Sequence, residues 1–154
     1  ELGKQVSLVR TDPGQLSRHY TAQDLQRSDE HAISIRSDDH GQPTIFEFQP
    51  GVEATIFGPY VTLPAGLYEV RFDLELTKPA TGTIAQLDLV GGLGTDQFGQ
   101  LRLDASQLAN GRTQITFPAK IPAKSSRIEV RLESKGAGLR VHQVTVHRLG
   151  PIPN

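Results

Sequence analysis

Apolar and charged residues alternate strictly along residues 67–76. A period of two places successive side chains on opposite faces of a strand, so one face of this segment is apolar and the other is charged. The apolar face holds Tyr68, Val70, Phe72, Leu74 and Leu76, and the charged face holds Glu69, Arg71, Asp73 and Glu75. The segment Pro64-Ala65-Gly66 just before it has the composition of a tight turn. The pattern predicts a strand of a half-buried antiparallel sheet, with Tyr68 pointing into the core.

Shorter apolar rows, separated by turn residues, follow one another along most of the chain. They comprise Ile33 and Ile35, Phe46 and Phe48, the segment 55–63, Ala85 with Leu87 and Leu89, Leu101 and Leu103, Ile115 and Phe117, and Ile128 with Val130 and Leu132. Many short strands with hardly any helix predict an all-β antiparallel β-sandwich, most simply a jelly roll of about nine strands. A closed barrel is the alternative, and a broad glycine-rich loop at 91–99 favours the sandwich.

The last strand changes phase halfway along its length. Its apolar positions are Leu139 and Val141 in one phase and Val144 and Val146 in the other. One extra residue in a strand, a β-bulge, shifts the alternation by one position. A bulge near His142-Gln143 would therefore return all four side chains to the same face.

The two ends of the chain have weaker patterns. Residues 1–30 alternate poorly, and we expect an irregular segment with a short strand at 6–9. The segment 21–25 predicts one helical turn capped by Thr21, because a threonine hydroxyl accepts hydrogen bonds from free backbone N–H groups. Residues 150–154 have the composition of a tail.

Composition excludes several classes of partner. At 154 residues the chain has the size of a single domain around one core. Its 17 acidic and 16 basic side chains nearly cancel, so there is no broad cationic field for nucleic acid or an anionic membrane. Cysteine is absent, and no apolar run approaches the length of a membrane-spanning helix. Because the chain begins at Glu1 and contains no methionine, we expect it to be part of a longer protein.

Two segments together resemble a known family. The sequence YVTLPAGLYEVRFDLEL at 60–76 is similar to the P-A-G-x-Y-x-V strand of jelly-roll carbohydrate-binding modules, families six and thirty-five being the nearest. The sequence IEVRLESKGAGLRVHQVTVHRL at 128–149 resembles their closing hairpin. Similar modules are attached to bacterial glycosyltransferases and other cell-envelope polysaccharide proteins. The resemblance implies that the partner is a carbohydrate or another domain of the same protein, and that the chain works outside the cytoplasm, in the periplasm or at the cell surface.

The chain also departs from the pattern of these families. Their members commonly carry acidic calcium ligands near the N-terminus and an aspartate in the final strand. Here Asp24 is the plausible N-terminal counterpart, and residues 139–144 contain no carboxylate. Because calcium prefers six or more oxygen ligands, a calcium ion is disfavoured and we expect no cofactor. The tryptophan that commonly stacks on the sugar is absent as well.

Four residues are the candidates for contact with a ligand. In the loop 91–99, Phe98 offers a ring to the C–H face of a sugar, and Asp96 and Gln97 offer hydrogen bonds to its hydroxyls. The alternative is that Phe98 anchors the loop at the edge of the sandwich. Tyr60 follows a predicted bend and either stacks on a ligand at the concave sheet face or packs in the core or at an edge.

Neither catalysis nor metal binding has a motif in this sequence. The five histidines show no H-x-H or H-E-x-x-H spacing, so we expect no metal site. There is no G-x-S-x-G motif and no cysteine nucleophile, and Arg71 interrupts the row of Glu69, Asp73 and Glu75. We therefore expect a non-catalytic module that recognises carbohydrate. The alternative is a structural or protein-interaction module that braces a neighbouring domain or subunit.

Overall fold

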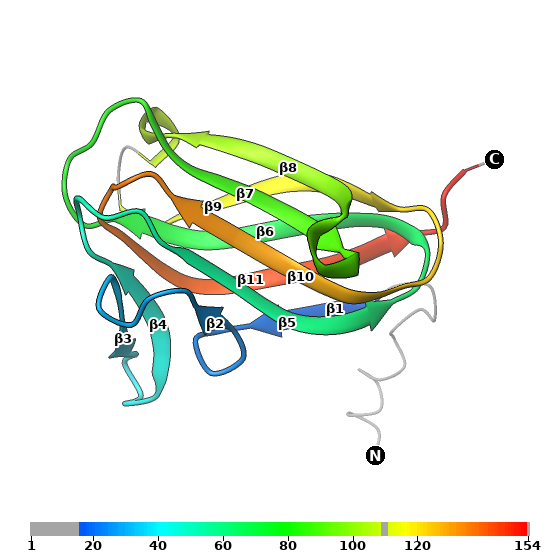
Figure 1. The fold of residues 1–154 in the computed structure, drawn as a ribbon, viewed down its shortest axis with the longest axis horizontal. Coiled ribbons are helices and arrows are strands. Elements are labelled where there is room, and N and C mark those ends of the chain that lie inside the picture. Colours follow the sequence, from blue (N-terminus) through cyan, green and yellow to red (C-terminus); the bar gives the residue numbers. More distant parts are fainter. Residues whose placement is uncertain (1–15, 109–110, 154) are drawn as a thin grey trace, which may run out of the picture.

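A computed structural model describes residues 16–108 and 111–153, which form two antiparallel sheets packed face to face (Figure 1). The strands are β1 (Ser17–Tyr20), β2 (Gln26–Arg27), β3 (Ile33–Ser37), β4 (Pro43–Phe48), β5 (Thr55–Leu63), β6 (Gly66–Leu76), β7 (Thr83–Gly91), β8 (Asp96–Asp104), β9 (Thr113–Ile121), β10 (Ser125–Ser134) and β11 (Leu139–Gly150), with two short 3-10 helices, η1 (Gly92–Gly94) and η2 (Ala105–Leu108). The strand expected at 6–9 lies outside the described residues.

Strands that are distant in sequence lie side by side in both sheets. The six-stranded sheet has the order β3-β4-β11-β6-β9, and β1 also pairs with β11, next to residues 144–147 of that strand. The five-stranded sheet has the order β2-β5-β10-β7-β8. This arrangement is the predicted all-β jelly-roll sandwich.

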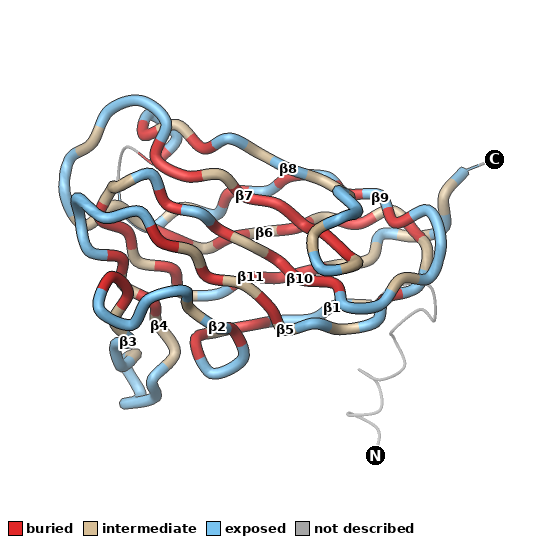
Figure 2. The backbone as a smooth tube through the Cα atoms, viewed as in Figure 1, coloured by how far each residue is buried: buried red, intermediate tan, exposed pale blue. Residues whose placement is uncertain are grey.

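The core lies between the sheets, where the alternating residues of β6 behave as predicted. Tyr68, Val70, Phe72 and Leu74 are at most 1% exposed, whereas the charged residues between them are half-buried. The Tyr68 hydroxyl donates a hydrogen bond to the Pro64 carbonyl oxygen at 2.7 Å, so the buried phenol also fixes the turn before its strand. Figure 2 shows buried positions along the strands and exposed positions at most turns.

The predicted bulge in β11 is confirmed. Val141 pairs with Leu74 of β6, but the next pair is Gln143 with Asp73, so His142 is the extra residue. Leu139, Val141, Val144 and Val146 are all buried as a result. The predicted turn at 21–25 is also present, since the Thr21 side-chain oxygen accepts a hydrogen bond from the Gln23 backbone N–H.

Two expectations about the secondary structure are wrong. The first concerns residues 1–30, where β1 and β2 occupy part of a stretch expected to be irregular and bring the described strands of the predicted sandwich to eleven. Strands β1 and β2 are too short to show a pattern, and their pairing with β11 and β5 defines them.

The broad loop expected at 91–99 is the second error, since β7 ends at Gly91 and β8 begins at Asp96. Gly99 pairs with Leu89 inside the sheet. A side chain at Gly99 would meet the Pro118 carbonyl oxygen at 2.5 Å. This glycine therefore permits a close approach of two strands, β8 and β9, rather than a flexible loop.

Candidate functional site

The outer face of the five-stranded sheet, which points away from the other sheet, gathers aromatic, charged and amide side chains. The register across its strands aligns two rows of outward residues: Phe57, Arg131, Asp88 and Gln100 in one, and Pro59, Glu129, Val90 and Gln97 in the next. Because the strands alternate, the residues between these rows, such as Leu87 and Leu89, point into the core. We call these two rows, with Tyr60, the five-stranded face.

Tyr60 stands on a bulge at the edge of this face. Val61 and Pro59 pair with consecutive residues of β10, so Tyr60 is the extra residue between them. Its backbone has φ 70°, a left-handed conformation that is uncommon for a tyrosine and costs on the order of 1 kcal/mol. The side chain is 38% exposed, so of the expected alternative, packing in the core or at an edge, only packing at an edge agrees with the structure.

The ring of Tyr60 is held by two neighbours. Phe57 packs against it edge to face, with the ring centroids 6.4 Å apart. The Tyr60 hydroxyl also interacts with the carboxylate of Glu129, a residue that is only 6% exposed. Burial raises the pKa of Glu129, and the nearby Arg131 guanidinium and the Tyr60 hydroxyl partly oppose this shift. The tyrosine is thus fixed in orientation before any ligand arrives.

An ion pair occupies the middle of the face. Arg131 donates two parallel hydrogen bonds to Asp88, of 2.9 Å and 2.7 Å. This bidentate bond to Asp88 raises the pKa of Arg131. The Arg131 side chain is 35% exposed and that of Asp88 only 8%, so the pair presents the fixed donors of the guanidinium at the surface.

Three glutamines continue the face toward the edge strand β8. The side-chain nitrogens of Gln86 and Gln97 both donate to the side-chain oxygen of Gln100, at 3.3 Å and 2.9 Å. Among the described residues, these bonds leave the amide nitrogen of Gln100 and the side-chain oxygens of Gln86 and Gln97 for a ligand. We call these three residues the amide ladder.

The turn between β7 and β8 covers one end of the face. The helix η1 packs against β10 (Figure 1), and a side chain added at Gly94 would lie 3.3 Å from the Arg131 guanidinium. This cover explains why Glu129 and Val90 are buried although they point outward. Leu93 at the tip of the turn is 61% exposed.

The four sequence candidates do not converge on one point. Tyr60 and Gln97 both belong to the five-stranded face, but they stand on β5 and β8. Phe98 is a bulge residue of β8 whose ring packs against the core and lies over Gly91. Asp96 is exposed at the start of β8, and binding by Asp96, Gln97 and Phe98 stays a prediction.

Asp96, Gln97 and Phe98 do line a pocket of their own, of about 530 Å³, together with Lys120 and Pro122. The sequence reading missed Phe57, Asp88, Glu129 and Arg131 as possible site residues. A signal for the last two was present, because charged residues alternate with apolar ones along 127–133.

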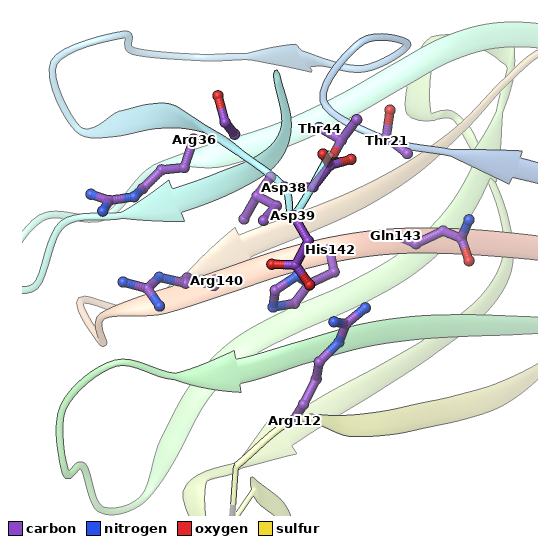
Figure 3. Close-up of a pocket in the computed structure, with 11 residues that line it drawn as sticks. Thr21, Arg36, Asp38, Asp39, Thr44, Arg112, Arg140, His142 and Gln143 are labelled. Carbon is purple, nitrogen blue, oxygen red and sulfur yellow. Dashed lines mark hydrogen bonds between the residues drawn. The ribbon is translucent and has the colours of Figure 1, made fainter. Parts of the chain in front are cut away.

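A second surface is a polar groove of about 460 Å³ on the outer side of the six-stranded sheet (Figure 3). Its floor includes His142 and Gln143, which the bulge turns outward together, and the turn of the β3–β4 hairpin forms one wall. The other lining residues include Arg36, Asp39, Arg112 and Arg140.

The charges of this groove are largely paired within the protein. Arg112 binds Asp73 through two hydrogen bonds, of 2.8 Å and 2.9 Å. His142 lies 2.6 Å from Glu75, and Arg140 lies 2.8 Å from Glu47. Such a network fits a stabilised surface at least as well as a binding site.

The hairpin wall of the groove is itself fixed by Asp38. Its carboxylate accepts backbone hydrogen bonds from Gln42 and His40 and one from the Thr44 hydroxyl. The bond from Gln42, followed by those from His40 and Thr44, lowers the pKa of Asp38. Asp38 therefore acts as a turn residue, as its position in the sequence suggests.

Asp24, the sequence candidate for a calcium ligand, takes part in a local turn. Its carboxylate accepts a hydrogen bond from the Thr21 backbone N–H. Within residues 16–108 and 111–153, no three His, Cys, Asp or Glu side chains gather into a cluster suited to a metal ion. The same residues include no helix with the length and apolar character needed to cross a membrane.

Several solved structures have the same fold. No family model matches the chain, and no curated protein matches it in sequence. A C-terminal family 6 carbohydrate-binding module of a Zobellia galactanivorans laminarinase superimposes with a TM-score of 0.60 at 13% identity, covering 85% of this chain and 98% of that module.

Two further carbohydrate-binding modules match equally well. A module from Cellvibrio mixtus lichenase 5A, solved with cellotriose, gives a TM-score of 0.58 at 15% identity and covers 84% of this chain and 95% of its own. A family 35 module from Clostridium thermocellum gives a TM-score of 0.59 at 13% identity and covers 85% of this chain and 97% of its own. All three are named as carbohydrate-binding modules. The chain therefore has the jelly-roll fold of family 6 and family 35 carbohydrate-binding modules.

Proposed function

We propose that this chain is a non-catalytic module that binds a glycan through its five-stranded face. The observation that carries the proposal is Tyr60, which a bulge and a left-handed backbone hold outward beside Phe57 and Glu129. Strained backbone conformations cluster at functional sites, which supports a role for this side chain. Packing in the core does not explain the left-handed conformation of Tyr60, because its side chain is 38% exposed.

The chemistry of the face suits a sugar. The aromatic pair offers an apolar surface to the C–H face of a pyranose ring, and this contact does not require tryptophan. The Arg131 guanidinium offers donors and the amide ladder offers both donors and acceptors, which hydroxyl groups need. A few such contacts on an open surface give weak affinity, with a Kd in the range of about 1 mM to 1 μM.

The biological setting is also part of the proposal. We expect the glycan to be an envelope or exported polysaccharide, and the chain to serve a larger extracytoplasmic protein such as a glycosyltransferase. The named modules from Zobellia and Cellvibrio belong to a laminarinase and a lichenase, which supports an accessory role beside an enzyme. The resemblance of residues 60–76 to modules of polysaccharide proteins supports the envelope setting.

Substitution of Tyr60 tests the proposal. We expect the wild-type chain to bind at least one polysaccharide on a glycan array, and Tyr60→Ala to lose about tenfold or more in affinity, because stacking on an aromatic ring is a major contact. Calorimetric titration measures the loss. Val52→Ala is the matched control, since Val52 is also an exposed apolar residue, 44% exposed, but lies away from the face.

Two results would contradict glycan binding at this face. Equal affinity of Tyr60→Ala and the wild type would place the site elsewhere. A blank array together with tight association to another fragment of the same protein would instead support the interaction module.

A further inference from the structure

We infer that the ligand of the five-stranded face carries a free amino group, whose ammonium form pairs with the carboxylate of Glu129. This inference rests on the proposed function and adds the chemical class of the ligand, an amino sugar rather than a neutral or an acidic one. Three features carry it: a carboxylate without a cation of its own, an opening from that carboxylate to the surface, and an aromatic ring beside it.

The Glu129 carboxylate has no cationic partner of its own. The neighbouring cation, Arg131, is engaged in the bidentate pair with Asp88. Burial raises the pKa of Glu129, Arg131 opposes this shift only in part, and Asp88 adds to it. Within the part of the chain that the structure describes, no salt bridge joins Glu129 to a basic side chain. Two carboxylates therefore share one guanidinium, and the cluster keeps a negative charge that is not balanced.

The elements packed around Glu129 do not supply the missing positive charge. The helix η1, which packs on β10, consists of residues 92–94 and has no charged side chain. On the two neighbouring strands, Pro59 of β5 and Val90 of β7 lie opposite Glu129, and both are uncharged. A cation that balances this cluster must therefore come from outside the described chain.

The carboxylate of Glu129 is covered but not sealed. The residue is 6% exposed, and among the described residues the Tyr20 hydroxyl is the one enclosed polar side-chain atom without a partner. The contact with Tyr60 occupies one carboxylate oxygen. Because the other oxygen has no such partner and is not enclosed, a ligand atom at the surface can reach it.

Tyr60 brings the sugar to this oxygen. Its side chain is 38% exposed and its hydroxyl interacts with the carboxylate, so the substituents of a sugar stacked on the ring lie next to Glu129. The face of a tyrosine ring also attracts a cation. An ammonium group can thus bind the carboxylate and the ring together, whereas a hydroxyl group forms a weaker, neutral hydrogen bond and an acidic sugar is repelled.

Three hexasaccharides with the same β-1,4-linked backbone test the amino group. Those of chitosan, chitin and cellulose differ at one position of each ring, which carries an amine, an acetylated amine or a hydroxyl. We expect the wild-type chain to bind the chitosan hexamer about fivefold to tenfold more tightly than the cellulose hexamer, because hydrogen bonds to charged groups are stronger than neutral ones. The chitin hexamer should not share this gain, because acetylation removes the charge. Calorimetric titration just below neutral pH measures the three affinities, and added salt should reduce the preference.

Two glutamine variants on β10 separate Glu129 from general electrostatic attraction. Glu129→Gln keeps the shape of the side chain and removes its charge, so the chitosan hexamer should bind no more tightly than the cellulose hexamer. Glu133→Gln is the matched control, since it removes the same charge from the same strand at an exposed site. The Glu133 side chain is 51% exposed and pairs with Lys135, and this variant should retain the preference for chitosan.

The possible failures are distinguishable. If none of the three hexasaccharides binds and a glycan array is blank, the proposed function fails and the inference with it. If a neutral glycan binds and Tyr60→Ala abolishes the binding, the function stands. The inference alone is then overturned by a chitosan hexamer that binds no more tightly than the neutral glycan, or by a preference that Glu129→Gln retains. Binding of an oligolysine peptide at Glu129 in place of every amino sugar would also overturn it and would indicate a protein partner.

Discussion

Glu129 is an acidic residue whose charged form is destabilised by its buried position on the outer face of a sheet. It is 6% exposed, since η1 packs over β10, and this burial raises its pKa. The folded state therefore holds the Glu129 proton more tightly than the unfolded state does. Such a group favours the folded state when it is protonated, and this contribution is lost as the pH rises through the folded-state pKa. If the proposed glycan site is correct, the interaction of this carboxylate with the Tyr60 hydroxyl orients the ring and explains why the buried acid is kept.

Replacement of Glu129 by glutamine should remove this pH dependence. Glutamine keeps an oxygen for the Tyr60 hydroxyl but carries no charge to desolvate. We expect the stability of Glu129→Gln relative to the wild type to be higher at about pH 7 than at about pH 5, because the wild type recovers stability on protonation. Urea unfolding of both proteins at the two pH values measures the difference. A difference that does not change with pH would contradict the assigned burial effect.

Three of the bulges in the described strands each add one side chain that bears on the five-stranded face or the core. The extra residues are Tyr60 in β5, Phe98 in β8 and His142 in β11. The first bulge aims a ring at solvent, the second aims a ring at the core, and the third restores the inward phase of the last strand. Bulges therefore shape both the five-stranded face and the packing of the core.

Deletion of the extra residue of the β11 bulge should cost less stability than deletion of a residue from the regular part of the strand. Without His142, the alternation from Val141 to Val144 becomes regular and the same valines point inward, so we expect a stability loss of about 1 kcal/mol or less, from the contact with Glu75. Deleting Thr145 instead turns Val146 outward, at a cost of about 2 kcal/mol or more. Thermal unfolding of the two deletions makes the comparison. Equal losses would show that His142 is not the extra residue.

Period-two patterning explains which elements could be predicted from the sequence. In long strands with one buried face, such as 67–76, the alternation of apolar and charged residues shows which side chains point into the core. In the last strand, the position where this alternation shifts by one residue located the bulge. The turn at 91–99 was misread because glycines that allow close packing look the same in sequence as glycines in loops. The face around Tyr60 arises from the pairing of β5 with β10 and of β10 with β7. No local pattern encodes these contacts, so Glu129 and Arg131 could not be joined to Tyr60.

At the scale of the whole molecule, the two sheets come closest where β8 meets β9. Gly99 of one sheet lies against Pro118 and Ala119 of the other, with no room for a side chain between them. The predicted single domain depends on such contacts, because each sheet alone would expose its apolar face to water.

Adding one methyl group at this contact should loosen the sandwich. In Gly99→Ala the new Cβ would meet backbone atoms of β9, which cannot rotate away as a side chain can. We expect a loss of about 2 kcal/mol in the free energy of unfolding. Unfolding should remain a single transition in calorimetry and circular dichroism, as expected of one domain. Two separate transitions would contradict the single-domain prediction.

The tyrosines differ in exposure, so the intrinsic fluorescence of this protein can report on a single one of them. The chain has three tyrosines and no tryptophan, and Tyr20 and Tyr68 are 8% and 1% exposed, against 38% for Tyr60. A collisional quencher such as acrylamide will therefore reach chiefly the emission of Tyr60. A molecule that covers this ring will shield it, so intrinsic fluorescence can report occupancy without any label.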